Sequence, residues 1–249
     1  MSSAKRVSPA AARDAAAAGA RIFVALDLAD VERARALARA LKGSVGGLKL
    51  GLELFSAGGI AAVAALKREG LPLFLDLKLH DIPNTVAGAV RALLPLEPAF
   101  LTLHASGGEA MLRAAAEAAA SAGARRPRLL AVTVLTSLDG SDLATVGQEG
   151  PLEAQAARLA QLAKGAGIDG AVCSPKEVAL LRARCGPDFL LVVPGIRPAW
   201  SEVGDQKRVM TPKEALAAGA DYLVIGRPII AAAEPRAAAE RIAAELAAP

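Results

Sequence analysis

The sequence predicts an α/β fold, a single-domain (β/α)8 TIM barrel, and three observations support this prediction. From Arg21 onward, short runs rich in β-branched and aliphatic residues alternate with longer Ala/Leu/Arg stretches of helical spacing. The alternation yields eight strand–helix units, the number that closes a parallel sheet into a barrel. The chain has 249 residues, which is close to the ~250 residues of such a barrel. We therefore expect a barrel domain over residues 21–249, preceded by an N-terminal extension over residues 1–20.

The expected strands follow one another at intervals that each leave room for a helix. They are Ile22–Leu26, Gly47–Leu50, Leu73–Leu77, Phe100–Leu103, Leu129–Leu135, Gly170–Cys173, Phe189–Val193 and Tyr222–Ile225. The helices expected after them are Val31–Leu41, Gly59–Glu69, Val86–Leu94, Glu109–Ala122, Leu152–Ala163, Lys176–Arg184, Pro212–Ala217 and Pro235–Ala247. An open doubly wound sheet is the structural alternative, because sequence alone does not show closure. We favour the barrel because eight comparable units match its required number.

Several helix starts carry capping signals that support these boundaries. Asp30 directly precedes the first helix, and Ser174-Pro175 opens another. The run Thr211-Pro212-Lys213-Glu214 combines an N-cap residue, a proline at the first helical position and a capping-box acid.

The first twenty residues, MSSAKRVSPAAARDAAAAGA, lack the continuous apolar core of a secretory signal. Their Ala, Ser and Arg content is similar to that of an organelle transit peptide, but Asp14 and the absence of a clear amphipathic face weigh against that interpretation. We expect a frayed or loosely docked extension. No run in the sequence reaches the ~18 apolar residues of a membrane span.

The composition excludes several kinds of site. The chain has 29 Lys and Arg residues and 25 Asp and Glu residues, so its net charge is +4. This charge is too small and too dispersed for a nucleic-acid-binding face, but it is compatible with a small anionic ligand. The two histidines and two cysteines form no close pair of zinc ligands. The separated cysteines are expected to be small core residues in a reducing compartment, which favours a cytoplasmic location. Aromatic residues make up 3%, too few for a platform that stacks single-stranded nucleic acid.

Charged residues at the carboxyl ends of expected strands indicate an active site, because parallel strands normally read as apolar and barrel active sites lie at that end. Asp27 ends the first strand, and Lys49 lies near the end of the second. Asp76 and Lys78 lie two residues apart on the third, so their side chains face the same way, and Asp81 follows just past it. One such pair is most often structural. Alternating charges on three adjacent strands instead favour a site that presses on a negative substrate group and delivers a proton from an ammonium.

Two loops have the composition of a phosphate site. Val193–Arg197 (VPGIR) ends the seventh strand, and Val224–Pro228 (VIGRP) ends the eighth. Loops at these positions commonly bind phosphate in barrels, since glycine lets backbone amides approach and arginine adds a bidentate cation. Either loop alone would be a glycine turn with a solvent-facing arginine, but the two together predict a phosphate site.

The stretch DLKLHDIPNT, residues 76–85, resembles the DxKxxDIPNT signature of the orotidine 5'-phosphate decarboxylase family. The resemblance spans about Arg21 to Ile230. In the expected order it includes VALD ending at Asp27, LKLG around Lys49, LTS at 135–137, PGIR ending at Arg197, DQxR at 205–208 and GRPI at 226–229.

The resemblance implies a carboxy-lyase that converts orotidine 5'-phosphate to uridine 5'-phosphate without a metal or organic cofactor, in the last step of de novo UMP synthesis. Lys49, Asp76, Lys78 and Asp81 would form the catalytic charged tetrad, with Lys78 as the proton donor to C6. The implied substrate-binding residues are Asp27 and Lys49 at the ribose, Thr136 and Ser137 at the pyrimidine edge, and Arg197, Gln206, Gly226 and Arg227 at the 5'-phosphate, with Pro194 as a further substrate-binding residue. Asp81, Ile82 and Thr85 would reach into the neighbouring subunit's site, which implies a homodimer.

Two alternatives remain open. One is a magnesium-dependent sugar-phosphate decarboxylase or aldolase of a related barrel family, although Lys49 stands where such enzymes place an acidic metal ligand on the second strand. The other is a non-catalytic nucleotide-binding barrel. His80 is expected to be structural, whereas His104 ends the fourth strand and could face the site.

Overall fold

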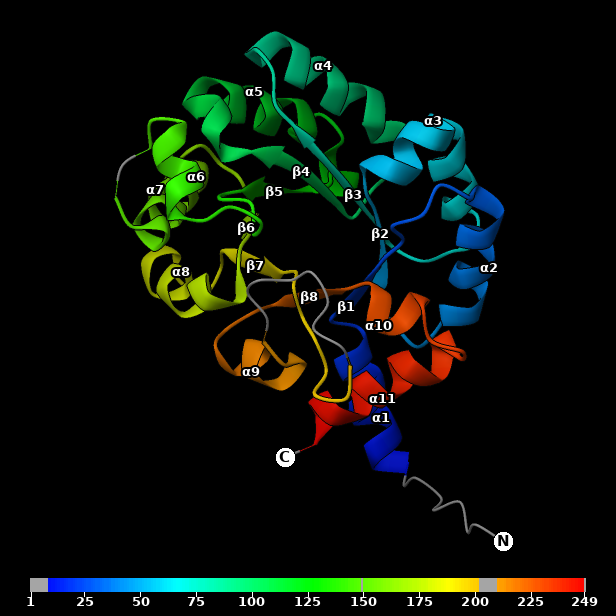
Figure 1. Cartoon of the computed structure of the whole chain (residues 1–249). Coiled ribbons are helices and arrows are strands. Elements are labelled where there is room, and N and C mark those ends of the chain that lie inside the picture. The colour runs from blue at the N-terminus through cyan, green and yellow to red at the C-terminus, as the bar shows by residue number, and fades with distance from the viewer. Residues whose placement is uncertain (1–8, 149, 202–209, 249) are drawn as a thin grey trace, which may run out of the picture.

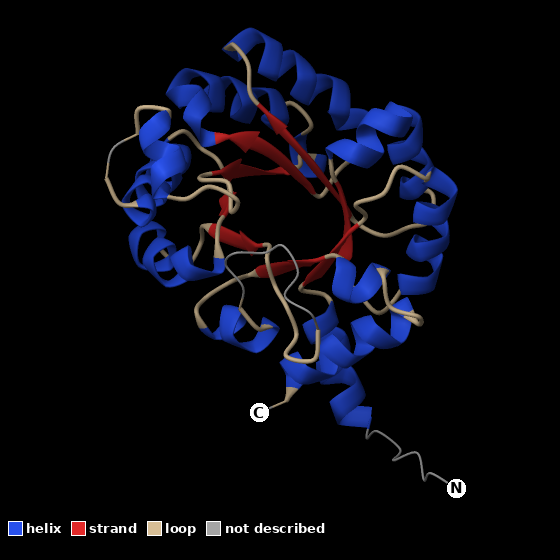
Figure 2. Ribbon diagram, viewed as in Figure 1, coloured by secondary structure: helices blue, strands red, loops and turns tan. Residues whose placement is uncertain are grey.

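A computed structural model of the chain describes residues 9–148, 150–201 and 210–248. Its eight strands are all parallel, pair in sequence order and close where β8 pairs with β1. Helices surround this closed sheet (Figures 1 and 2). The (β/α)8 prediction is confirmed, and the open doubly wound alternative is wrong.

The strands lie where the sequence predicts them. They are β1 (Ile22–Ala25), β2 (Gly47–Leu50), β3 (Leu73–Leu79), β4 (Phe100–His104), β5 (Arg128–Val132), β6 (Gly170–Val172), β7 (Leu190–Val193) and β8 (Tyr222–Ile225). The main difference is β5, which ends at Val132 rather than at Leu135. The next strand, β6, has three residues and pairs only as far as Val172, so the chain beyond Val132 has no ladder to continue.

The helices also agree with the expected units, with three additions. They are α1 (Pro9–Gly19), α2 (Val31–Leu41), α3 (Leu52–Lys67), α4 (Pro83–Leu93), α5 (Gly108–Ala120), α6 (Gly140–Thr145), α7 (Leu152–Gly165), α8 (Val178–Cys185), α9 (Pro212–Ala217), α10 (Arg227–Ile230) and α11 (Pro235–Ala247). Short 3-10 turns occur at Leu94–Leu96, Ala105–Gly107, Gly123–Arg125 and Pro175–Glu177. The sequence does not predict α1, α6 and α10. It predicts only the second part of α3, because Gly59 interrupts that helix with a φ of 56°.

The predicted caps are present. The Asp30 side chain accepts a hydrogen bond from the Arg33 amide at 3.0 Å. Ser174 and Glu177 form a capping box, and so do Thr211 and Glu214.

Of the two expectations for the N-terminal extension, frayed or loosely docked, residues 9–19 agree with docking. These residues form α1, which packs against α11 near the other end of the chain (Figure 1). Alanine has the highest helix propensity, and α11 is also rich in alanine, so two narrow helices can approach closely. Residues 1–8 lie outside the described part of the chain.

The barrel interior is filled by a layer of aromatic rings. Four of the chain's seven aromatic residues, Phe23, Phe74, Phe100 and Tyr222, contact one another edge-on with ring centroids 5.1 to 6.1 Å apart. Gly47 makes room for them, because a side chain there would collide with the Phe23 ring. This layer forms a rigid apolar floor below the carboxyl ends of the strands.

The space between the barrel and its helices is filled by Leu, Val, Ile and Ala side chains. Cys173 and Cys185 are buried and unpaired, which confirms that they are small core residues. In the described ranges, no helix combines the length and the apolar character needed to cross a membrane.

Candidate active site

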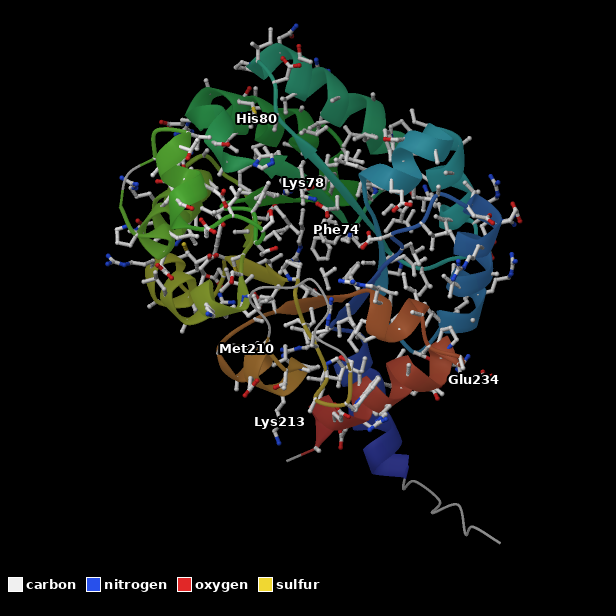
Figure 3. The ribbon with its side chains drawn as sticks, viewed as in Figure 1. Phe74, Lys78, His80, Met210, Lys213 and Glu234 are labelled. Atoms are coloured by element: carbon white, nitrogen blue, oxygen red, sulfur yellow. The ribbon has the colours of Figure 1, made fainter. Side chains whose placement is uncertain are left out.

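A cavity of about 230 Å³ opens at the carboxyl ends of the strands, above the aromatic floor. In the view of Figure 3, Phe74 and Lys78 lie near the centre of the barrel, whereas His80 lies closer to its rim. The lining residues are Ala25, Asp27, Lys49, Phe74, Asp76, Lys78, Val132, Val134, Leu135, Thr136, Val172, Pro194, Gly195, Arg197, Val224, Gly226 and Arg227. One side of the cavity is charged and another is apolar, as a heterocycle with an anionic substituent would require.

Four side chains of alternating charge form a connected array in this cavity. Lys49 Nζ lies 3.2 Å from Asp27 Oδ1 and 3.4 Å from Asp76 Oδ2. Lys78 Nζ donates to the same Asp76 Oδ2 at 2.9 Å. Lys49 and Asp76 are buried, whereas Asp27 is exposed at the cavity mouth. The array thus places one buried carboxylate between two ammonium groups, and the sequence correctly predicts that these residues come together.

The surroundings of Asp76 keep it ionised. Burial alone raises the pKa of its carboxyl, but the charges of Lys49 and Lys78 and the hydrogen bonds from Lys78 and Thr102 together lower the pKa below its ordinary value. A fixed negative charge therefore faces the cavity throughout the physiological pH range. An anionic group placed beside it is repelled, and a cationic centre or a proton donor is favoured.

A bulge in β3 orients this part of the array. Leu75 pairs with Leu101 and Leu79 pairs with Leu103, so two extra residues are accommodated on β3. Lys78 has a left-handed backbone with φ of 49°. Asp76 and Lys78 do meet as predicted, but they do so on an irregular strand and not through simple alternation.

Asp81, Ile82 and Thr85 do not join the cavity of their own chain. All three are exposed, with Ile82 at 66%, and they lie where β3 passes into α4. The Asp81 carboxylate accepts a hydrogen bond from the Ile82 amide at 2.6 Å. Asp81 and Ile82 line a separate, more open hollow with His80, Pro83, Ser106 and Gly107. A single chain therefore brings together three members of the predicted tetrad and leaves Asp81 outside.

The predicted phosphate residues Arg197, Gly226 and Arg227, together with Pro194, also line the cavity. They follow β7 and β8, and β8 pairs with β1 beside Asp27. Arg197 is buried, and its guanidinium donates to the Ile196 carbonyl at 2.9 Å. Arg227 is exposed and is the first residue of α10, so this cation lies at the cavity rim. Gln206 lies outside the described residues.

The two predicted pyrimidine contacts separate in the structure. Thr136 lines the cavity and is half-buried. Ser137 is exposed and is not among the lining residues. Both follow β5 in the irregular segment before α6.

The two histidines form a pair beside the cavity. Their ring centroids lie 5.3 Å apart, and neither ring lines the cavity. Burial, followed by the nearby His80 and Lys78, lowers the pKa of His104, which keeps its imidazole neutral. The expectation that His104 could face the site is wrong for this cavity.

Sequence reasoning overlooks two features of the site. Phe74 forms part of the cavity floor, and Thr102, fully buried on β4, donates to Asp76 Oδ1 at 3.0 Å. A hydroxyl in the otherwise apolar run FLTL is the signal that could have revealed Thr102. In the parts of the chain that the structure describes, no group of three or more His, Cys, Asp or Glu side chains is placed to hold a metal ion.

The chain is similar to proteins of one family over nearly its whole length. The orotidine 5'-phosphate decarboxylase / HUMPS family matches residues 20–242. The chain is 59% identical to a protein from Paramagnetospirillum magneticum over 229 residues, which cover 90% of this chain and 97% of that one. It is 56% identical to a protein from Rhodospirillum rubrum, with coverage of 90% and 93%. Both relatives are named orotidine 5'-phosphate decarboxylase.

A solved structure gives the same result. The crystal structure of orotidine 5'-phosphate decarboxylase from Lactobacillus acidophilus aligns with a TM-score of 0.80 and 41% identity. The alignment covers 91% of this chain and 99% of that one.

Proposed function

The chain belongs to the orotidine 5'-phosphate decarboxylase / HUMPS family and is an enzyme of the carboxy-lyase class. From this premise we propose that it removes carbon dioxide from orotidine 5'-phosphate to give uridine 5'-phosphate, the last step of de novo UMP synthesis, without a cofactor. The observation that carries the proposal is the Asp27–Lys49–Asp76–Lys78 array, because it shares one cavity with Arg197 and Arg227.

The array has the charges that this reaction needs. In the proposed complex the substrate carboxylate lies beside Asp76, and the C6–carboxylate bond breaks to release carbon dioxide. The bonding electron pair stays on C6, where the ammonium of Lys78 stabilises the developing charge and then donates its proton. The 2.9 Å hydrogen bond from the Lys78 ammonium to Asp76 supports this role, because it fixes the direction of the ammonium beside the place proposed for the substrate carboxylate.

The part of the cavity that follows β7 and β8 supports binding of a nucleotide 5'-phosphate. Arg197 and Arg227 supply cations, and Gly195 and Gly226 leave the backbone open to close approach. A short helix after β8 is a recurrent part of barrel phosphate sites, and α10 occupies that position. We assign Gln206 to the same phosphate, Asp27 and Lys49 to the ribose, and Thr136 and Ser137 to the pyrimidine edge, on the family resemblance.

The proposal of metal-free chemistry is supported by the donor set. Among the described residues, the two carboxylates that line this cavity are Asp27 and Asp76, and both lie within 3.4 Å of the Lys49 ammonium. A magnesium ion bound between them would meet that cation at close range, and its preferred ligands are oxygens. This arrangement weighs against the magnesium-dependent sugar-phosphate alternative.

We also propose a homodimer in which each chain completes the other's site with Asp81, Ile82 and Thr85. The exposure of these three residues supports this, as does the place of Asp81 in a hollow apart from its own cavity. A cytoplasmic location is part of the same proposal and is supported by the two free cysteines.

The activity is tested by following ultraviolet absorbance after orotidine 5'-phosphate is added, with and without a metal chelator. Conversion that the chelator does not affect supports the proposal. Conversion lost with chelator and restored by magnesium supports the sugar-phosphate alternative's metal chemistry and contradicts ours. Tight nucleotide binding without conversion indicates a non-catalytic barrel.

Sharing of sites is tested by mixing two inactive variants, Lys78→Ala and Asp81→Ala, after exchange of subunits. If Asp81 acts across the interface, each mixed dimer has one intact site, and random exchange restores about one quarter of wild-type activity. If Asp81 acts within its own chain, every site lacks one residue and no activity returns.

A further inference from the structure

We infer that Thr102 is a positioning residue for the reaction, because its one hydroxyl holds both the carboxylate of Asp76 and the backbone of Lys78. The hydroxyl donates to Asp76 Oδ1 at 3.0 Å and accepts from the Lys78 amide at 2.9 Å. The inference rests on the proposed function, because that function assigns the catalytic roles to Asp76 and Lys78.

The strand register explains why a side chain is needed at this point. Between the pairs Leu75–Leu101 and Leu79–Leu103, three residues of β3 lie opposite the single residue Thr102. The regular parallel ladder is interrupted there, so backbone groups in the bulge need other partners. The Lys78 amide finds its partner in the Thr102 hydroxyl.

The conformation of Lys78 adds to this requirement. Its φ of 49° is unfavourable for a residue with a side chain and persists only where neighbouring groups hold it. The bond to Thr102 is one such restraint, and it acts directly on the residue that carries the proposed proton donor.

Because of Thr102, the two carboxylate oxygens of Asp76 have different partners. Oδ1 accepts from Thr102, and this leaves Oδ2 for Lys78 at 2.9 Å and Lys49 at 3.4 Å. Without the hydroxyl, Oδ1 has lost a donor in a site where Thr102 itself is fully buried, and the carboxylate can turn toward either lysine.

The test compares Thr102→Val and Thr102→Ala, which lack the hydroxyl, with Thr102→Ser, which keeps it. Thr133→Val is the matched control, because Thr133 is also a buried threonine, lies just past the end of β5, and donates to the Val172 carbonyl at 3.3 Å away from the array. For Thr102→Val we expect kcat to fall about 10- to 100-fold, as for a lost bond to a charged group, with KM changed less than about 3-fold. Thr102→Ser and Thr133→Val are expected to keep kcat within about 3-fold of the wild type.

A second readout needs no substrate and follows the Asp76 carboxyl by 13C NMR during a pH titration, assigned with Asp76→Asn. The hydrogen bond from Thr102 is one of the causes that lower the pKa of Asp76, so its loss raises that pKa. We expect an upward shift in Thr102→Val and Thr102→Ala and none in Thr102→Ser or Thr133→Val.

The outcomes separate this inference from the proposed function. If the wild type does not decarboxylate orotidine 5'-phosphate, the proposed function is wrong, and the NMR titration still decides whether Thr102 positions Asp76. If the wild type is active and folded Thr102→Val or Thr102→Ala keeps full kcat with an unmoved Asp76 titration, the inference is overturned and the proposed function stands.

Discussion

Replacing Lys49 with methionine tests how much the attraction between Lys49 and Asp76 contributes to the stability of the protein. Lys49 and Asp76 are both buried, and their charged atoms lie 3.4 Å apart. At an effective dielectric constant of about 20, two unit charges at this distance attract by about 5 kcal/mol. The methionine variant loses this attraction, but it also avoids the free-energy cost of burying an ammonium, which offsets part of the loss. We therefore expect the free energy of unfolding to fall by about 3 kcal/mol near neutral pH.

The pH dependence gives this prediction its sharpest form. In the wild type the pKa of Asp76 lies below its unfolded value, so its stabilising contribution is present above the unfolded pKa and is lost as pH falls through the folded pKa. Removing Lys49 takes away the largest cause that lowers this pKa, so that burial, which raises it, is opposed only by Lys78 and Thr102. The Asp76 carboxyl of the variant therefore takes up a proton at higher pH than that of the wild type, and acid neutralises the negative charge that Lys78 alone then balances. The difference in unfolding free energy between the two proteins should narrow as pH falls.

The measurement is urea unfolding by far-ultraviolet circular dichroism at about pH 7.5 and about pH 4.5, with protein concentration held constant in case of a dimer. Lys176→Met removes an exposed ammonium outside the array and is the control for the loss of one positive charge. This account of the array is refuted if Lys49→Met loses no more unfolding free energy than the control. It is also refuted if the loss is greater at the lower pH.

Three further predictions concern other parts of the chain. Lys78→Ala should abolish decarboxylation and leave the far-ultraviolet spectrum unchanged, and measurable turnover would rule out its role as proton donor. Arg227→Ala should lower kcat/KM by about 100- to 1,000-fold, because a cation–phosphate contact can supply several kcal/mol that also organise the charged site; an unchanged kcat/KM contradicts the phosphate assignment. Arg182→Ala should lower the free energy of unfolding by about 3 kcal/mol, since this guanidinium donates to the carbonyls of Gly186, Pro187, Phe189 and Gly219 and to Asp221. The exposed Arg184→Ala on the same helix should change it little, and equal effects of the two would be inconsistent with this network.

The barrel is predictable from the sequence because its elements depend on local patterns. Each strand is a short apolar run, and helices such as α2 and α9 begin at side-chain caps that the sequence displays. The array is predictable for a related reason. Charges at the ends of apolar parallel strands must converge on one face once the sheet closes, so Lys49 and Asp76 meet although they are distant in the chain.

What the sequence does not reveal depends on non-local geometry. The bulge in β3 arises from its pairing with β4, so the link between Thr102 and Lys78 has no signature in either strand alone. The docking of α1 likewise depends on α11, more than two hundred residues away in the chain. Ser137 lies beside Thr136 in sequence but outside the cavity, because the segment after β5 is irregular and adjacent residues there need not share a face.

The position of an aspartate relative to its strand separates structural from chemical roles in this barrel. Asp169 and Asp221 directly precede β6 and β8, and each accepts from an arginine and from a backbone amide of the neighbouring strand, Leu129 or Leu191. These carboxylates help to fix the amino ends of the strands. Asp76 lies toward the opposite end of its strand, and its partners within the described part of the chain are two lysine ammoniums and one hydroxyl.

This difference has a physical cause. At the amino end of a strand the first amides and an arginine can satisfy a carboxylate completely, and the resulting cluster stabilises the sheet without facing a ligand. At the carboxyl end of β3 the nearby Lys78 amide donates to Thr102, and the charge of Asp76 is balanced by lysine side chains that also face the cavity. When lysine balances the carboxylate, a proton donor and a fixed negative charge lie in contact. Such a buried ion pair contributes little to the stability of a core, but its two charges can act on a carboxylate substrate. The same residue type thus stabilises the fold at one end of the barrel and supplies the proposed chemistry at the other.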